Sequence, residues 1–374
     1  MSEYQYYEFL AVDRPLTPKQ IEQVRAFSSR ADITSTSFVN EYNWGDFKGD
    51  PAKFLERWFD LMLYYANWGT HTLMMGLPAD ALPEGIVKAY CVGEAAWFKI
   101  HGEKMLLGFD SQDDSGDYDE SYDWSMASLA PIREELLRGD LRPLYLGWLL
   151  CAHNGELAEG DAEPPVPPGM GKLSAAQTEL VDFLRIDEDL LELAAGASAP
   201  REERTQDVGR IVAMLSPADR EELLTQFLAG DDPRLAMKVL RRHGAGVLPG
   251  KTTGRTVGEL LAEADRRRAE REEAERHRRA AARARRDAET ARQRTAELDA
   301  LLSQGERPWQ EVETLVGTKT PGNYERAVSL LIDLRDAAAR TAALDAFTRR
   351  VEEIRARHAK KSTFIDRLKK KKLV

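Results

Sequence analysis

The sequence predicts an α+β domain at the N-terminus, followed by all-α regions that include one long charged helix. Two observations predict this fold class. Up to residue 111, β-prone segments alternate with amphipathic segments that begin at helix-capping residues. After residue 129 the apolar residues recur only at the spacing of a helix. Between residues 259 and 304 the chain has no glycine or proline and consists largely of Ala, Arg and Glu, which are strong helix formers.

Two helix starts are visible in the N-terminal region. Thr17 and Asp50 each precede a proline, so that a capping side chain stands before the first helical position. Gln20 adds a capping box to the first of these helices. The apolar face of the second helix runs over residues 54–63, at the spacing that a buried helix requires.

The strands of this region are rich in aromatic and β-branched residues. The pair His101-Gly102 marks a hairpin turn. The order of strands and helices predicts one sheet layer that is covered by helices on one side. Strands are expected at residues 4–12, 32–42 and 70–76, and in a hairpin at 96–109.

Composition shifts divide the chain into five segments. An acidic loop at residues 110–123 fails the calcium-loop template, because a tyrosine stands where a bidentate Glu is needed. The Pro-rich stretch 164–169 is interpreted as a rigid connector packed against its own domain, rather than as a ligand for an SH3-like module. The segments are an α+β domain at 1–127, a helical domain at 128–243, a linker at 244–255, the long helix at 256–304 and a helical module with a basic C-terminus at 305–374.

Short helices with cap-like starts follow the Pro-rich connector and recur in the C-terminal module. No consensus repeats at a fixed spacing, which argues against a solenoid. The expected helices lie at 173–184, 187–195, 202–215, 217–228, 233–243, 308–316, 324–338 and 344–358.

The long helix is expected to begin at a capping box of Thr256 and Glu259. Its middle has Ala as the only apolar residue, whereas a stable coiled coil needs large aliphatic side chains over several heptads. We therefore expect a solvated single helix, with a weak coiled coil as the alternative. The apolar anchors near its ends are Leu260, Leu261, Leu298, Leu301 and Leu302.

Charge is divided unevenly along the chain. Of the net −10, residues 1–200 contribute −19 (15 Lys and Arg against 34 Asp and Glu), and residues 201–374 contribute +9 (38 against 29). The two halves are expected to meet different partners, or else to attract one another within the chain or between copies. Attraction between copies would make the chain a homo-oligomer.

Two parts of the C-terminal half are strongly basic. The long helix has no acidic residue between Arg276 and Arg286. The closing stretch interleaves basic residues with Phe364 and Leu368, which predicts an amphipathic basic helix suited to nucleic acid, an anionic membrane or an acidic protein. The candidate binding residues are Arg278, Arg279, Arg283, Arg285, Arg286, Lys360, Lys361, Arg367, Lys369, Lys370, Lys371 and Lys372.

The sequence contains no recognised catalytic, cofactor or metal-binding motif. The triplet at 250–252 (Gly-Lys-Thr) lacks the first glycine of a phosphate loop and the strand that should precede it. Cys91 and Cys151 are expected to be buried, reduced thiols. No apolar run is long enough to cross a membrane and no secretory signal is visible, so we expect a cytoplasmic protein.

We therefore expect a non-enzymatic binding or scaffolding protein whose basic half contacts nucleic acid or an acidic partner. Self-assembly through the long helix is one alternative. An enzyme with a pocket in the N-terminal domain is another. The side chains that would line such a pocket, or else fill the core and turns of the sheet, are Asn40, Tyr42, Asn43, Trp44, Asn67 and Trp68.

Four stretches, SFVNEYNWGDFKGDP, LYLGWL, EPPVPPG and HAKKSTFIDRL, resemble parts of an uncharacterised bacterial protein family, and this resemblance spans the chain but implies no activity. Residues 324–368 are also similar to the tails of bacterial SWIM-type zinc-finger proteins, which implies an association of the tail with nucleic acid. The chain lacks the Cys/His set with which SWIM domains bind zinc, so zinc binding is not implied.

Overall fold

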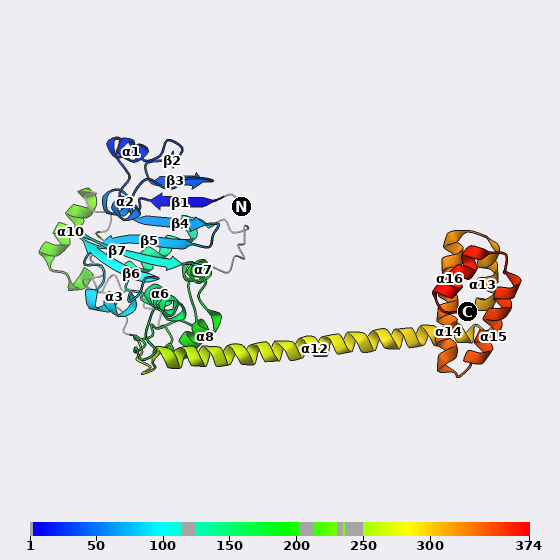
Figure 1. The fold of residues 1–374 in the computed structure, drawn as a ribbon. Helices are drawn as coiled ribbons and strands as arrows, with labels where there is room; N and C mark the ends of the chain where they lie inside the picture. Colours follow the sequence, from blue (N-terminus) through cyan, green and yellow to red (C-terminus); the bar gives the residue numbers. More distant parts are fainter. Residues whose placement is uncertain (1–2, 114–123, 202–211, 230–234, 236–249) are drawn as a thin grey trace. The chain divides into compact units, whose positions relative to one another are not determined.

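The computed structural model describes residues 3–113, 124–201, 212–229, 235 and 250–374, and the chain divides into two units, Met1–Glu270 and Arg271–Val374 (Figure 1). Each unit has a hydrophobic core of its own. The first unit contains 28 Lys and Arg against 46 Asp and Glu, a formal charge of −18, and the second contains 25 against 17, a formal charge of +8. The uneven charge of the sequence thus belongs to two structural units of opposite sign.

The described part of the first unit is built on an antiparallel sheet of seven strands in the order β2-β3-β1-β4-β5-β7-β6. Strand β1 lies between β3 and β4 and places Phe9 opposite Phe38 and Met62. Strands β6 and β7 form the predicted hairpin, with Gly102 at positive φ (61°) in its turn. The strands are β1 Gln5–Leu10, β2 Asp32–Ile33, β3 Ser37–Tyr42, β4 Leu61–Ala66, β5 His71–Pro78, β6 Ala96–His101 and β7 Lys104–Ser111.

Two helices of the first unit begin at the caps that the sequence predicts. The Thr17 side chain accepts from the backbone of Gln20 in a complete capping box, and the Asp50 carboxylate accepts from the first turn of the next helix. The helices within the described residues are α1 Pro18–Arg25, α2 Pro51–Arg57, α3 Glu84–Tyr90, α4 Met126–Leu129, α5 Pro131–Leu137, α6 Arg142–His153, α7 Ala175–Leu184, α8 Glu188–Ala197 and α10 Pro217–Ala229, followed by the start of α12, Val257–Ser303.

Helices cover both faces of the sheet, and the prediction of a one-sided layer is therefore wrong. Helices α1 and α2 pack on one face in a core that contains Phe9 and Phe54. Helices α3 to α8 pack around a second core, which contains Leu63 of β4. Because side chains alternate along a strand, the neighbours Met62 and Leu63 enter opposite cores.

Strand β4 occupies residues that were predicted to continue the second helix. Helix α2 ends at Arg57, and β4 begins at Leu61. The strand pairs with β1 on one side and with β5 on the other, so partners distant in the sequence override the local helical spacing. Two smaller differences are the division of the strand expected at 32–42 into β2 and β3, and helix α3, which was not predicted.

The Pro-rich connector packs against its own unit. Isolated β-bridges join Ala162 to Thr256 and Val166 to Lys251, in the segment that leads into α12. The Tyr90 hydroxyl donates a hydrogen bond to the carbonyl of Pro165 (2.6 Å). The residues around Lys251 therefore hold the connector in place.

Helix α12, Val257–Ser303, begins at the predicted capping box. The Thr256 amide donates to the Glu259 carboxylate (3.0 Å), and the Glu259 amide donates to the Thr256 hydroxyl (3.2 Å). Leu260 is buried in the first unit, and Leu298 is buried near the other end of the helix. Every residue from 269 to 293 is exposed. The long helix is confirmed, whereas the coiled coil requires a second chain and stays a prediction.

The second unit is a helical module, all of whose residues are described. Its core contains Val316, Leu331, Val351 and Phe364. Ion pairs also join its helices, and one of them links Arg294 of α12 with Asp333 of α14, Pro321–Arg340 (2.6 Å). The helices after α12 are α13 Arg307–Gly317, α14 Pro321–Arg340, α15 Leu344–Arg357 and α16 Ser362–Lys370.

Some predicted segments fall largely outside the described residues. These are the acidic loop at 110–123 beyond residue 113, the helix at 202–215 before residue 212, and nearly all of the helix at 233–243. Helix α10 confirms the prediction for 217–228.

Candidate functional site

The arginines predicted as binding residues on α12 fall into two groups. Arg279 donates to Glu275 (Nε–Oε1 3.0 Å), and Arg283 lies 3.9 Å from Asp287, in both cases one helical turn away. Arg278, Arg285 and Arg286 form no ion pair with any residue that the structure describes. A partner could therefore contact these last three without first displacing an acidic neighbour.

One further arginine, Arg292, joins this group. It is exposed, and it has no ion pair within the described residues. Arg278, Arg285 and Arg292 are spaced seven residues apart, and we call them the arginine row. In a straight helix a step of seven residues turns the side chain by only ~20° and advances it by about 10.5 Å, so the row lies along one face. The seven-residue spacing of these arginines is the signal in the sequence from which the row could be predicted.

The basic tail divides in the same way. The Lys361 ammonium donates to the carbonyl of Val316 (2.7 Å) at the end of α13, and Arg367 forms an ion pair with Glu325 (2.6 Å). These two side chains therefore hold the module together. The remaining predicted residues of the tail are exposed and have no ion pair within the described residues: Lys360, Lys369, Lys370, Lys371 and Lys372.

The four closing lysines are held by a defined helix end. The Leu373 amide donates to the carbonyl of Leu368 (3.0 Å), and the Lys372 amide donates to that of Lys369 (3.0 Å). This pattern requires a left-handed residue after the helix, a position that glycine usually occupies, and Lys372 takes it with φ 55°. Leu373 then enters the core of the module, so the end of the chain is anchored and the lysines face solvent.

The apolar face of the closing helix is already occupied. Phe364 and Leu368 are fully buried in the core of the second unit. The amphipathic pattern of α16 therefore serves packing, and its apolar face is not free to enter a membrane surface. None of the described helices combines the length and the apolar character that a membrane span needs.

The side chains proposed for an N-terminal pocket are divided between the core and the surface of the first unit. Asn40 and Tyr42 are buried parts of β3, and Asn40 donates to Ser28 (3.1 Å). Asn67 accepts from the backbone of Tyr4 in the turn after β4, a structural role. Trp44 is 69% exposed beneath the guanidinium of Arg30 (4.9 Å to the ring centre). The other two residues of the set, Asn43 and Trp68, are exposed.

His71 has the chemistry of a catalytic base, but its neighbours occupy both ring nitrogens. Nδ1 lies 2.7 Å from the carbonyl of Phe183, and Nε2 lies 3.1 Å from the guanidinium of Arg185. Because arginine can only donate, Nε2 accepts and Nδ1 carries the proton. Burial is the main cause that lowers the pKa of His71 to about 4, and the charge of Arg185 adds to it. The ring is therefore neutral and has no free lone pair.

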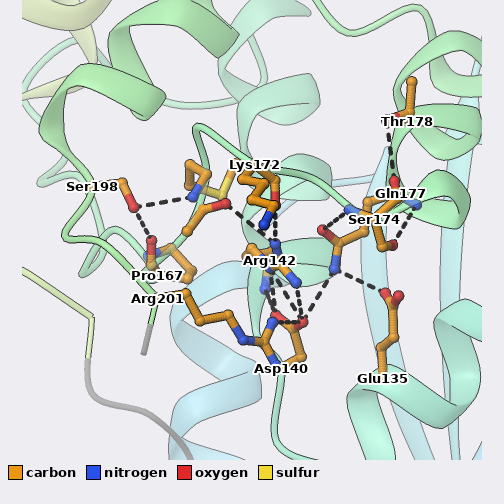
Figure 2. A network of polar contacts seen from close by, with 12 residues as sticks. Glu135, Asp140, Arg142, Pro167, Lys172, Ser174, Gln177, Thr178, Ser198 and Arg201 are labelled. Atoms are coloured by element: carbon orange, nitrogen blue, oxygen red, sulfur yellow. Dashed lines mark hydrogen bonds and ion pairs between the residues drawn. The ribbon is translucent and has the colours of Figure 1, made fainter. Parts of the chain in front are cut away.

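Figure 2 shows a buried polar network around Asp140. Arg142 donates to Asp140 (Nη2–Oδ2 2.6 Å) and to the carbonyls of Gly169 and Lys172 (3.2 and 2.8 Å). Arg201 forms a second ion pair with Asp140. Burial alone would raise the pKa of Asp140, but the hydrogen bonds and charges of Arg142 and Arg201 lower it. The network joins the end of the Pro-rich connector to α6 and is structural.

No known protein family matches the chain, and no curated protein and no solved structure is similar to it. No group of three or more His, Cys, Asp or Glu side chains within the described ranges is arranged to hold a metal ion. The function must therefore be inferred from the residues themselves. Among them, the unpaired cations of the second unit are the most distinctive feature.

Proposed function

We propose that the chain is a binding protein whose basic C-terminal unit contacts nucleic acid. One observation carries this proposal: nine of the exposed Lys and Arg side chains just described have no ion pair in a unit of formal charge +8. They are Arg278, Arg285, Arg286, Arg292, Lys360, Lys369, Lys370, Lys371 and Lys372. Such cations bind phosphates and release the counterions that surround them.

The composition of the exposed segment favours phosphate over a protein partner. Residues 269–293 contain Ala as their only apolar residue type, and all of them are exposed. Protein interfaces usually have a desolvated core enriched in aromatic residues, Met and Arg, with charged side chains depleted there. A phosphate backbone needs no apolar core, so this surface suits it better.

The acidic first unit is not expected to touch the same partner. Its formal charge of −18 would repel a phosphate backbone. We propose that it has a separate partner, which would make the chain a scaffold between the two. Buried, free Cys91 and Cys151 support a reducing compartment such as the cytoplasm.

Binding of a labelled DNA duplex to the full chain, measured by fluorescence anisotropy at about 50 mM salt, tests this proposal. In the row variant, Arg278→Gln, Arg285→Gln and Arg292→Gln remove the arginine row. In the control variant, Arg276→Gln, Arg279→Gln and Arg283→Gln remove the same charge from the same helix, but from arginines that have intrahelical partners. We expect a much larger loss of affinity in the row variant. Absence of binding by the unaltered chain at low salt would contradict the proposal.

Self-assembly is the second candidate, because the two units have opposite formal charges of −18 and +8. Light scattering of the full chain at low and at high salt distinguishes it from the first. An oligomer at low salt that dissociates at high salt supports assembly through these charges. A monomer under both conditions excludes it.

A further inference from the structure

We infer that the nucleic acid bound by the second unit is a duplex, recognised through its backbone and without preference for a base sequence. This inference rests on the proposed function and makes it more specific. It depends on the charges of the second unit and on its lack of exposed Trp, Tyr and Phe rings. Both can be judged because the structure describes every residue of that unit.

The second unit offers bases one exposed aromatic ring, the imidazole of His277, and no exposed Trp, Tyr or Phe ring. Its four Trp, Tyr and Phe side chains are Trp309, Tyr324, Phe347 and Phe364, and the last three are buried. The guanidinium of Arg350 lies 4.7 Å from the ring centre of Trp309, whose indole is also close to Phe347 (5.8 Å between ring centres). Proteins that bind single strands gain about 1–3 kcal/mol per stacked base. In this unit that source of affinity is limited to one imidazole and the partly buried Trp309.

The arginine row has the geometry of a rigid line of charge. Arg278, Arg285 and Arg292 are separated by about 10.5 Å each along an unbroken helix. A flexible single strand must lose conformational freedom to follow such a line, whereas a duplex already presents phosphates along a stiff surface. A rigid row of cations therefore favours the partner that is itself rigid.

Charge density points to the same partner. A duplex carries one negative charge per ~1.7 Å of its axis and has a dense layer of condensed counterions. The slope of log K against log salt concentration is therefore about −0.9 for each phosphate contacted on a duplex, compared with about −0.7 on a single strand. A surface that binds by counterion release alone therefore gains more affinity from a duplex than from a single strand. No hydrogen bond within the described residues fixes the orientation of Arg278, Arg285 or Arg292, so each guanidinium is free to follow the phosphates of any base sequence.

Competition between nucleic acids of equal length tests the inference on the full chain. The probes are a DNA duplex, an RNA duplex and each of their single strands, all of one mixed sequence, with a second duplex of unrelated sequence. We expect at least one duplex to bind about tenfold more tightly than its own single strands, and the two DNA duplexes to bind equally. The DNA and RNA arms then show which duplex is the partner.

Two results would overturn the inference while leaving the proposed function intact. One is binding of a single strand as tightly as of its duplex, and the other is a strong preference for one of the two duplex sequences. Failure of the full chain to bind any of these probes at low salt would instead remove the proposed function itself. The row variant separates these cases further, because its loss of affinity should be greater for the duplex than for the single strand.

Discussion

Arg255 forms two parallel hydrogen bonds with the buried carboxylate of Glu163, from Nε to Oε2 (2.9 Å) and from Nη2 to Oε1 (2.7 Å). Tyr145 donates to the same carboxylate (2.5 Å), and Thr253 also contacts it. Glu163 immediately precedes the Pro-rich connector, and Arg255 lies two residues before α12. This pair therefore fixes the base of the long helix to the first unit.

Replacing Glu163 with Ala should destabilise the first unit by about 3–5 kcal/mol, because it leaves the charge of Arg255 largely buried and without a partner. Chemical denaturation followed by tryptophan fluorescence measures this loss. Glu272→Ala removes an exposed carboxylate from an ion pair with Arg276 and should cost less than about 1 kcal/mol. Equal effects of the two changes would contradict the structural role of Glu163.

The buried His71 predicts a loss of stability in acid. Its pKa is about 4 in the folded chain and about 6.5 when exposed, so the unfolded state binds more protons between these values. The free energy of unfolding should therefore fall as the pH falls from about 6.5 to about 4, by up to roughly 3 kcal/mol. His71→Gln removes this contribution, and the difference in slope between the two proteins is the quantity to measure. Parallel pH profiles would show that the imidazole is not held neutral.

The exposed part of α12 should be the first site of tryptic cleavage in this helix. Residues 269–293 make no buried contacts, so this segment opens locally at a low cost in free energy. Mass spectrometry of a brief digest should locate early cuts there, before cuts in α13 to α16. Protection of the segment at high protein concentration, together with an oligomer in light scattering, would instead favour the coiled coil.

Replacing Lys372 with Gly should have opposite effects on the stability of the second unit and on its affinity for a duplex. Its left-handed backbone costs a non-glycine residue about 1 kcal/mol, so Lys372→Gly should stabilise the second unit by up to that amount. The same change removes an unpaired cation and should weaken binding of a duplex. Lys372→Gln is the matched variant, which removes the charge while keeping the strain. Thermal denaturation and anisotropy of both variants separate the two effects.

Much of the fold could be predicted, because its signals are local. The capping box at Thr17 and the turn at Gly102 depend on neighbouring residues alone, as does the unbroken run of helix formers in α12. Strand β4 could not be predicted, since residues 54–63 have a helical spacing and only the pairing of β4 with β1 and β5 makes residues 61–66 a strand.

The ion pairs of the candidate binding residues also divide into those with partners close in the sequence and those with partners on other helices. The partner of Arg279 lies four residues away at Glu275, so its ion pair could have been predicted from the sequence. The partner of Arg367 is Glu325 on another helix, and Lys361 is held by the carbonyl of Val316. These contacts depend on how the helices pack, and only the structure could separate such cations from the unpaired ones.

The salt dependence of duplex binding tests the central claim most directly. The affinity of the full chain should fall linearly on a plot of log K against log salt between about 50 and about 200 mM. If each residue of the arginine row neutralises one phosphate, the row variant should have a slope smaller by about 2.7, and the control variant should change it much less. A slope that is the same in the unaltered chain and in the row variant would contradict the claim that these arginines bind phosphates.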